Sequence, residues 1–133
     1  MFHILPLVDP KLIKETKSGY EKPVVYKDID ERLECTTERS NPAANFSWTY
    51  QNIKDGCKEP SDCLSGKWIK ISGGVGKVEQ QSPNTSILVV PRNVDRKVFK
   101  CTATNPAKRG KIDWKLYEFV RRSKSTQLLK VFI

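Results

Sequence analysis

The sequence predicts an all-β fold in which two sheets pack face to face and are joined by a disulfide bond. Short segments alternate apolar and polar residues with the two-residue period of half-buried strands. No long segment has the periodicity of an amphipathic helix. Cys35 and Cys101 lie on two of the alternating segments, and Trp48 lies on a third segment between them. These features favour a sandwich of strands over a helical or mixed fold.

The order Cys35, Trp48, Cys101 is typical of the immunoglobulin-like sandwich, in which one disulfide joins the sheets and the indole packs against it. We therefore expect a two-sheet Greek-key sandwich of about seven or eight strands. Its core should contain Trp48, Phe99 and Leu88.

The 133 residues divide into one domain and two short extensions. Residues 1–22 are interrupted by prolines and a glycine, so they supply at most one edge strand, at 3–8. Residues 23–120 hold the alternating segments and form the immunoglobulin-like domain. Residues 121–133 are a basic C-terminal extension or linker with an apolar end.

The first half of the domain contains three candidate strands. Residues 23–26 are a short edge segment that leads into the first main strand, 31–37, where Cys35 shares a face with a leucine. A turn at 40–44 follows. The next strand, 45–51, places its three aromatic side chains on one face.

A long insertion at 52–66 contains Cys57 and Cys63. The four cysteines allow three pairings, and the sequence alone does not decide among them. The sandwich pairs Cys35 with Cys101 and leaves Cys57 with Cys63. A bond between the last two would close the insertion and stabilise the fold by roughly 2–3 kcal/mol.

The second half of the domain contains four candidate strands. We expect Trp68 to point inward and the glycines of 73–76 to form a flexible turn rather than a phosphate-binding loop, because the lysine of such a loop is missing. The turn leads into the segment 77–79. The expected strands are 67–71, 85–90, 97–104 and 111–120.

The cysteines also indicate the compartment. A zinc site needs ligand pairs about two to four residues apart with supporting histidines, and the only histidine is His3. Disulfides form in oxidising compartments, so we expect an extracellular protein without metal or other cofactor. The start of the chain lacks the features of a signal peptide, and no apolar run is long enough to cross a membrane. We expect a fragment of a larger cell-surface protein that reaches the membrane only through a segment outside this chain.

Two tripeptides match the N-glycosylation pattern, starting at Asn45 and at Asn84. Asn84 lies in an expected turn, whereas Asn45 begins the strand that carries Trp48. We therefore expect Asn84 to be the better glycan acceptor of the two.

The chain also resembles a known receptor family. Trp48, the two cysteines of the insertion, Trp68, and the segments 86–90 and 99–105 are similar to immunoglobulin repeats in the ectodomains of receptor tyrosine kinases. The closest are receptors of the platelet-derived and vascular endothelial growth factor type. The resemblance covers roughly residues 31–120. It implies growth-factor binding or receptor–receptor contact, with any kinase outside this chain.

The resemblance further implies a contact site in the loop before the second cysteine. Some members of the family use an arginine and an acidic residue there for twofold receptor contacts, and Arg92 and Asp95 occupy the matching stretch. A solvated turn, or a structural pair within the domain, is the competing interpretation. The same stretch departs from the usual pattern, since Phe99 stands where many of these domains have a tyrosine whose hydroxyl fixes a corner.

The net charge of +9 points to an acidic partner. Nucleic acid is disfavoured by the oxidising compartment and by the lack of a recognition motif. Heparan sulfate or an acidic protein ligand fits better, and a generally basic surface without a partner is the alternative. The candidate patch lies on the last hairpin and its exit and comprises Lys108, Arg109, Lys111, Lys115, Arg121, Arg122 and Lys124.

The sequence contains no catalytic signature. One histidine near the terminus makes a nucleophile–histidine arrangement implausible. Three functions are therefore open: a receptor module that binds a protein ligand or a second receptor copy, an adhesion module that binds heparan sulfate, and a structural spacer.

Overall fold

The computed structural model describes residues 8–13, 20–40, 42–53, 64, 66–105 and 113–123. Within these ranges the fold has ten strands, and it contains no helix of the length and apolarity that crossing a bilayer requires. Four of the strands are two residues long and the others are six to eight. The strands are β1 (Tyr20–Glu21), β2 (Val25–Tyr26), β3 (Glu31–Thr36), β4 (Asn45–Asn52), β5 (Ile69–Lys70), β6 (Lys77–Ser82), β7 (Thr85–Val90), β8 (Lys97–Thr104), β9 (Asp113–Phe119) and β10 (Arg121–Arg122).

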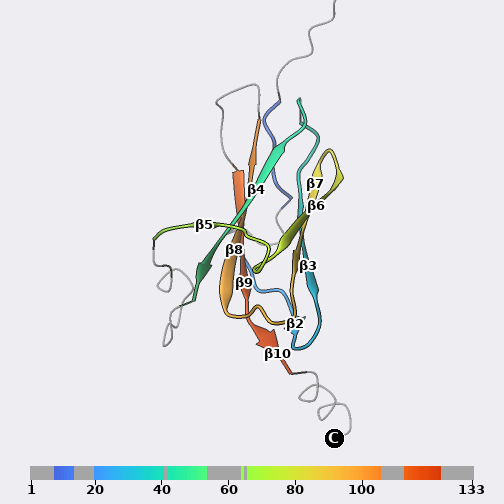
Figure 1. The fold of residues 1–133 in the computed structure, drawn as a ribbon. Coiled ribbons are helices and arrows are strands. Elements are labelled where there is room, and N and C mark those ends of the chain that lie inside the picture. The colour runs from blue at the N-terminus through green and yellow to red at the C-terminus, as the bar shows by residue number, and fades with distance from the viewer. Residues whose placement is uncertain are drawn as a thin grey trace, which may run out of the picture.

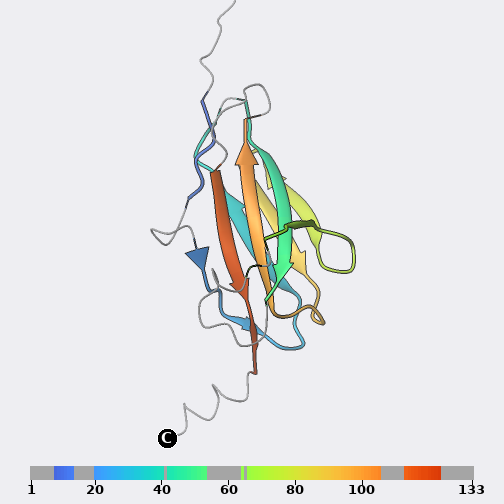
Figure 2. The ribbon, with the colours of Figure 1, turned by 90° about the vertical axis from the view of Figure 1, so that its left-hand side faces the viewer.

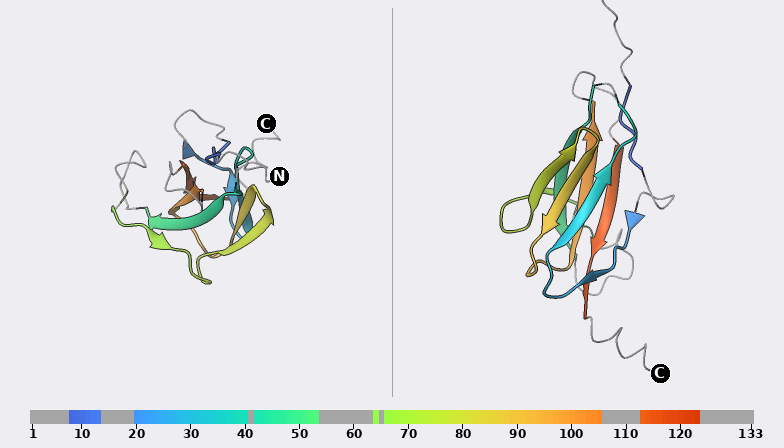
Figure 3. Two further views of the ribbon diagram at one scale, coloured as in Figure 1. Left: turned by 90° about the horizontal axis from the view of Figure 1, so that it is seen from above. Right: turned by 90° about the vertical axis from the view of Figure 1, so that its right-hand side faces the viewer.

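The strands form two facing sheets and a short ribbon. One sheet has the order β1-β9-β8-β4-β5, and the other has the order β3-β7-β6. Figure 1 shows the two layers side by side, Figure 2 shows the five-stranded sheet face-on, and the right-hand view of Figure 3 shows the three-stranded sheet from its own side. β2 and β10 pair in parallel at one end. The expected all-β sandwich is confirmed, with more short strand pieces than the seven or eight strands expected.

The disulfide and the tryptophan lie at the centre of the sandwich. Cys35 on β3 is bonded to Cys101 on β8, with the two Cα atoms 6.5 Å apart. Trp48 on β4 lies opposite Cys101 in the register. Its indole N–H donates a hydrogen bond of 3.0 Å to the hydroxyl of Ser86 on β7, and so crosses from one sheet to the other. Both side chains are buried, so this bond satisfies the only polar atom of the indole inside the core.

Aromatic rings fill much of the remaining core. Phe99 and Phe119 are fully buried and meet edge to face, with ring centroids 5.5 Å apart. The indole of Trp48 stacks on Tyr117 at 5.8 Å. Leu88 is fully buried as well. The three residues expected in the core, Trp48, Phe99 and Leu88, are therefore in it.

A tyrosine on another strand provides a link that Phe99 cannot make. The hydroxyl of Tyr117 on β9 donates a hydrogen bond to the backbone carbonyl of Glu34 on β3. Because β9 and β3 belong to different sheets, this bond also joins the two layers.

The folded unit extends beyond the expected limits of 23–120. Leu12 is buried, forms a β-bridge with Thr37 on the way out of β3, and donates its N–H to the carboxylate of Asp113 at 2.7 Å. β1 pairs in parallel with β9. At the other end, β10 pairs with β2, so Arg121 and Arg122 belong to the domain rather than to a linker.

The strand around Trp68 is shorter than expected. Only Ile69 and Lys70 pair with β4, and Trp68 itself is half-buried outside the core cluster. The ammonium of Lys100 lies 5.0 Å from the centroid of its ring. Lys100 alternates with Cys101, so it stands on the outer face of the sheet. The expectation that Trp68 points inward is therefore wrong.

The glycine-rich turn at 73–76 is held by backbone hydrogen bonds, whereas the sequence predicts a flexible turn. The amides of Val75 and Gly76 both donate to the carbonyl of Ser72, at 2.9 and 3.1 Å. A Cβ on Gly76 would lie 2.8 Å from the Leu88 side chain and 3.3 Å from the carbonyl of Val89. Gly76 is thus needed because β7 passes close to the turn.

The Trp48–Ser86 bond leads to a prediction about stability. Ser86→Ala leaves a buried indole N–H without an acceptor, so the free energy of unfolding should fall by about 1–3 kcal/mol. Urea unfolding with the disulfide intact, followed by circular dichroism, measures this value. Ser72→Ala, at an exposed serine, is the control and should change it by less than about 0.5 kcal/mol. Equal values for the two variants would contradict the role given to the bond.

Candidate interaction surface

Two loops and the last strand, β10, meet at one end of the sandwich. We call this end the exit pole and define it as residues 27–30, 91–96 and 121–123. The loop between β2 and β3 lies there beside the loop between β7 and β8, at the end where β10 leaves the domain (Figure 1).

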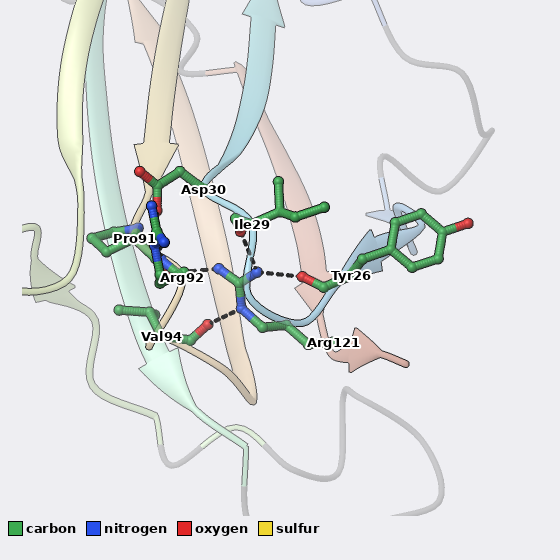
Figure 4. Close-up of polar contacts among 7 residues, drawn as sticks. All are labelled: Tyr26, Ile29, Asp30, Pro91, Arg92, Val94 and Arg121. Atoms are coloured by element: carbon green, nitrogen blue, oxygen red, sulfur yellow. Dashed lines mark hydrogen bonds and ion pairs between the residues drawn. The ribbon is translucent and has the colours of Figure 1, made fainter. Parts of the chain in front are cut away.

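A buried arginine holds the exit pole together (Figure 4). The side chain of Arg121 donates four hydrogen bonds to backbone carbonyls of the two loops and the end of β2. Its guanidinium carbon also lies 4.9 Å from the ring centroid of Phe119. The acceptors are Val94 at 2.5 Å, Tyr26 at 2.6 Å, Ile29 at 2.7 Å and Pro91 at 2.7 Å. Arg121 therefore fixes segments that are far apart in the sequence in a single arrangement.

Asp95 fixes the second loop from the inside. One of its carboxylate oxygens accepts the backbone N–H of Arg96 at 2.7 Å and that of Arg121 at 2.8 Å. Arg96 has a φ of 55°, a left-handed conformation that non-glycine residues rarely adopt. The contact with Asp95 helps to hold that conformation. Asp95 is thus a structural residue that holds the backbone of this loop.

Arg92 has a different environment from Asp95. Its backbone N–H donates to the carboxylate of Asp30 at 2.8 Å, and its Nε lies 3.5 Å from the same oxygen. Both side chains are largely exposed, 68% for Arg92 and 52% for Asp30. The pair lies on the outside of loops whose backbones Arg121 holds. The exposed charged residues of the exit pole are Lys27, Asp28, Asp30, Arg92, Arg96 and Arg122.

The structure does not assemble the described part of the expected basic patch. Lys115 lies on the inner side of β9, where its ammonium is 3.2 Å from the carboxylate of Glu21 and its side chain is 6% exposed. Arg121 is buried in the exit pole. The expectation that Lys115 and Arg121 belong to an exposed basic patch is therefore wrong, because side chains held inside the domain are not available to a sulfated partner. Arg122 is exposed, and Lys108, Arg109, Lys111 and Lys124 lie outside the described residues.

An open cavity of about 640 Å³ lies beside Lys115. The N-terminal segment, β3 and β9 line it, and the Lys115–Glu21 ion pair forms part of its wall. The ammonium of Lys115 also lies 5.1 Å from the ring centroid of Tyr117. Among the described residues no cluster of three or more histidine, cysteine or acidic side chains is suited to hold a metal ion.

The two sequons have the reverse of the expected exposure. Asn84 is half-buried in the turn between β6 and β7, where its amide nitrogen donates to the carbonyl of Thr37 at 3.2 Å and its oxygen accepts from the hydroxyl of Ser82 at 2.7 Å. Asn45 and Ser47 are exposed. The exposure of the two asparagines therefore favours Asn45, whereas the position of Asn84 in a turn is as expected. The expected Cys57–Cys63 bond lies outside the described residues.

The Arg121 network leads to a second stability prediction. Arg121→Met keeps the length of the side chain but removes all four hydrogen bonds, so the free energy of unfolding should fall by at least about 2 kcal/mol. Hydrogen exchange at the amides of Lys27 and Val94, which bond to carbonyls within the exit pole, should become faster. Arg122→Met, at the exposed neighbour, is the control. Unchanged exchange in Arg121→Met would show that the arginine does not hold the loops.

Comparison with known proteins identifies the fold. No protein-family model matches the chain, and no curated protein sequence is similar to it. Solved structures do match. The titin M3 domain has a TM-score of 0.56 at 11% identity over 86% of this chain and 99% of its own. The Ig7 domain of Dscam1, isoform 9, has a TM-score of 0.51 at 17% identity over 84% and 97%.

A third structure, the tandem Ig repeats of Dlar, has a TM-score of 0.56 at 19% identity. It matches over 88% of this chain, which spans about half of that structure. At these identities the likeness concerns the fold alone. The chain has the immunoglobulin-like fold.

Proposed function

We propose that this domain is an extracellular, non-enzymatic recognition module that contacts a second copy of itself through the exit pole. The observation that carries the proposal is the exposed Arg92–Asp30 pair, which stands on loops held by Arg121. The Cys35–Cys101 disulfide supports an oxidising compartment. The resemblance to receptor tyrosine kinase ectodomains supports a place in a cell-surface receptor, where receptor copies meet.

The Arg92–Asp30 pair suits a twofold contact between identical copies. In such a contact a residue of one copy faces a different residue of the other, and the reverse holds across the axis. Arg92 and Asp30 carry opposite charges and lie side by side, so two poles placed face to face can exchange partners: each Arg92 turns from its own Asp30 to that of the other copy. The exchange leaves neither Arg92 nor Asp30 without an oppositely charged partner.

The rigidity of the loops lowers the cost of such a contact. Ordering a loop on binding costs free energy, and a loop that is already fixed avoids most of that cost. Here the guanidinium of Arg121 holds the backbones of both loops, and the carboxylate of Asp95 holds the second one as well. A small contact of this kind is weak by itself. Receptors tethered at about millimolar local concentration still make use of it.

Heparan sulfate is a less favoured partner. The net charge of +9 supports it, but two of the three described patch residues are held inside the domain. Binding to heparin with a steep dependence on salt would favour this partner, and the absence of salt dependence would count against it. A module that binds neither a copy of itself nor heparin would be a spacer.

A mixing experiment tests the twofold contact. Arg92→Glu puts two negative charges side by side, and Asp30→Arg puts two positive charges there. Each variant alone should self-associate at least about tenfold more weakly than the unchanged protein, because like charges then face each other. An equal mixture of the two variants should regain the association. Sedimentation equilibrium at high protein concentration measures all three samples.

The control uses the Arg32–Glu79 pair on the three-stranded sheet. Its atoms are 3.3 Å apart and its side chains are 51% and 42% exposed, which makes it similar to the pair at the pole. Arg32→Glu and Glu79→Arg should leave association unchanged. The proposal fails if the unchanged protein stays monomeric, or if the mixture associates no better than its two components.

A further inference from the structure

We infer that Asn45 carries an N-linked glycan whose first sugars lie over the indole of Trp114 and cover one end of the outer face of the five-stranded sheet. The inference rests on the extracellular location in the proposed function, because glycan transfer takes place in the secretory pathway. It is independent of the contact at the exit pole.

The register places the residues concerned on one face. Asn45 on β4 pairs with Thr104 on β8, and Ser47 lies in a row with Thr102 and Trp114. These positions alternate with Trp48 and Cys101, which face the core. Side chains of successive residues in a strand point to opposite faces, so Asn45, Ser47 and Trp114 all stand on the outer face.

Exposure supports a glycan at this place. Asn45 and Ser47 are both exposed, so both sequon residues that the transfer reaction requires are accessible to solvent. The backbone carbonyl of Asn45 accepts a hydrogen bond from the hydroxyl of Thr104 at 3.4 Å. By contrast, the side chain of Asn84 is bonded at both its nitrogen and its oxygen in the fold.

Trp114 lies within reach of a sugar on Asn45. It is 40% exposed, although tryptophan is a largely buried residue in most proteins. The two positions are separated by two strand spacings, about 10 Å, across the sheet and by two residues, about 7 Å, along it. An asparagine side chain with two sugar rings is long enough to bridge this separation. The C–H face of a pyranose ring can then lie against the face of the indole.

The covalent step is an ordinary glycosyl transfer from a lipid-linked oligosaccharide. The amide nitrogen Nδ2 of Asn45 forms a bond to C1 of the first N-acetylglucosamine. The bond between C1 and the oxygen of the lipid pyrophosphate breaks, and the pyrophosphate leaves with the bonding electron pair. The amide loses one proton, so charge and atoms balance.

The position of the glycan fits a contact at the exit pole. β4 begins, β8 ends and β9 begins at the same end of the sheet, and β10 leaves from the opposite end (Figure 2). A glycan on Asn45 therefore covers sheet surface far from Arg92 and Asp30. It would keep other proteins off this part of the sheet while leaving the pole open.

Secretion from eukaryotic cells, with an added signal peptide, tests the attachment. Peptide mapping after enzymatic release of the glycan in heavy-oxygen water should mark Asn45 as the occupied site. Asn45→Gln and Ser47→Ala should each remove the corresponding mass, and both change exposed residues that the core does not use. Asn84→Gln should leave the Asn45 glycan in place. An unmodified Asn45 in the secreted protein would overturn the inference.

Hydroxyl-radical footprinting tests the position of the sugars. Oxidation of Trp114 should be at least about threefold slower in the glycosylated protein than in the same protein after enzymatic deglycosylation. Trp68, which lies against Lys100 on the same outer face, is the internal control and should be oxidised at the same rate in both. Equal oxidation of Trp114 before and after deglycosylation would overturn the covering role, even with Asn45 occupied. Neither result depends on self-association. The glycan proposal can therefore be contradicted while the contact at the exit pole is confirmed, and the reverse.

Discussion

The packing of the two sheets depends on Trp48, which lies at the centre of the contacts between them. The indole lies opposite Cys101, whose sulfur is bonded to Cys35 on the other sheet. Its N–H reaches Ser86 on that sheet, and its ring stacks on Tyr117. The hydroxyl of Tyr117 in turn reaches the backbone of β3. One covalent bond and two hydrogen bonds thus join the layers around a single buried side chain.

These central contacts hold the two sheets together without help from the loops at either end. The loops at each end can therefore differ without weakening the contact between the sheets. At the exit pole a charged side chain, that of Arg121, connects the backbones of the loops. A guanidinium is suited to this role because its planar donors can serve several carbonyls at once, and it stays charged at any physiological pH. The charged group of Arg121 lies against backbone carbonyl dipoles and an aromatic ring.

The features that could be predicted from the sequence are those with a local signal. Alternation within single strands predicted β3, β4 and β8 closely, and a short apolar run predicted β7. The spacing of Cys35, Trp48 and Cys101 predicted how the two layers join. The structural role of Arg121 could not be predicted, because its partners are backbone carbonyls of loops far away in the sequence. Every residue has such a carbonyl, so the sequence does not mark the ones that accept these bonds. A signal did exist for Lys115. Lys115 is two residues from Tyr117 on the same strand, so both side chains face the inside of the sandwich. A buried ammonium needs an oppositely charged partner, and Glu21 on the neighbouring strand β1 provides it.

The parallel pairing of β1 with β9, and of β10 with β2, has a mechanical consequence. Strands from the start and the end of the chain lie side by side, and tension applied along the sandwich pulls them in opposite directions. The ladder hydrogen bonds are then loaded in shear, so they share the force and must break together rather than one after another. In a domain connected in this way, tension between the two ends of the chain loads both parallel pairs in shear.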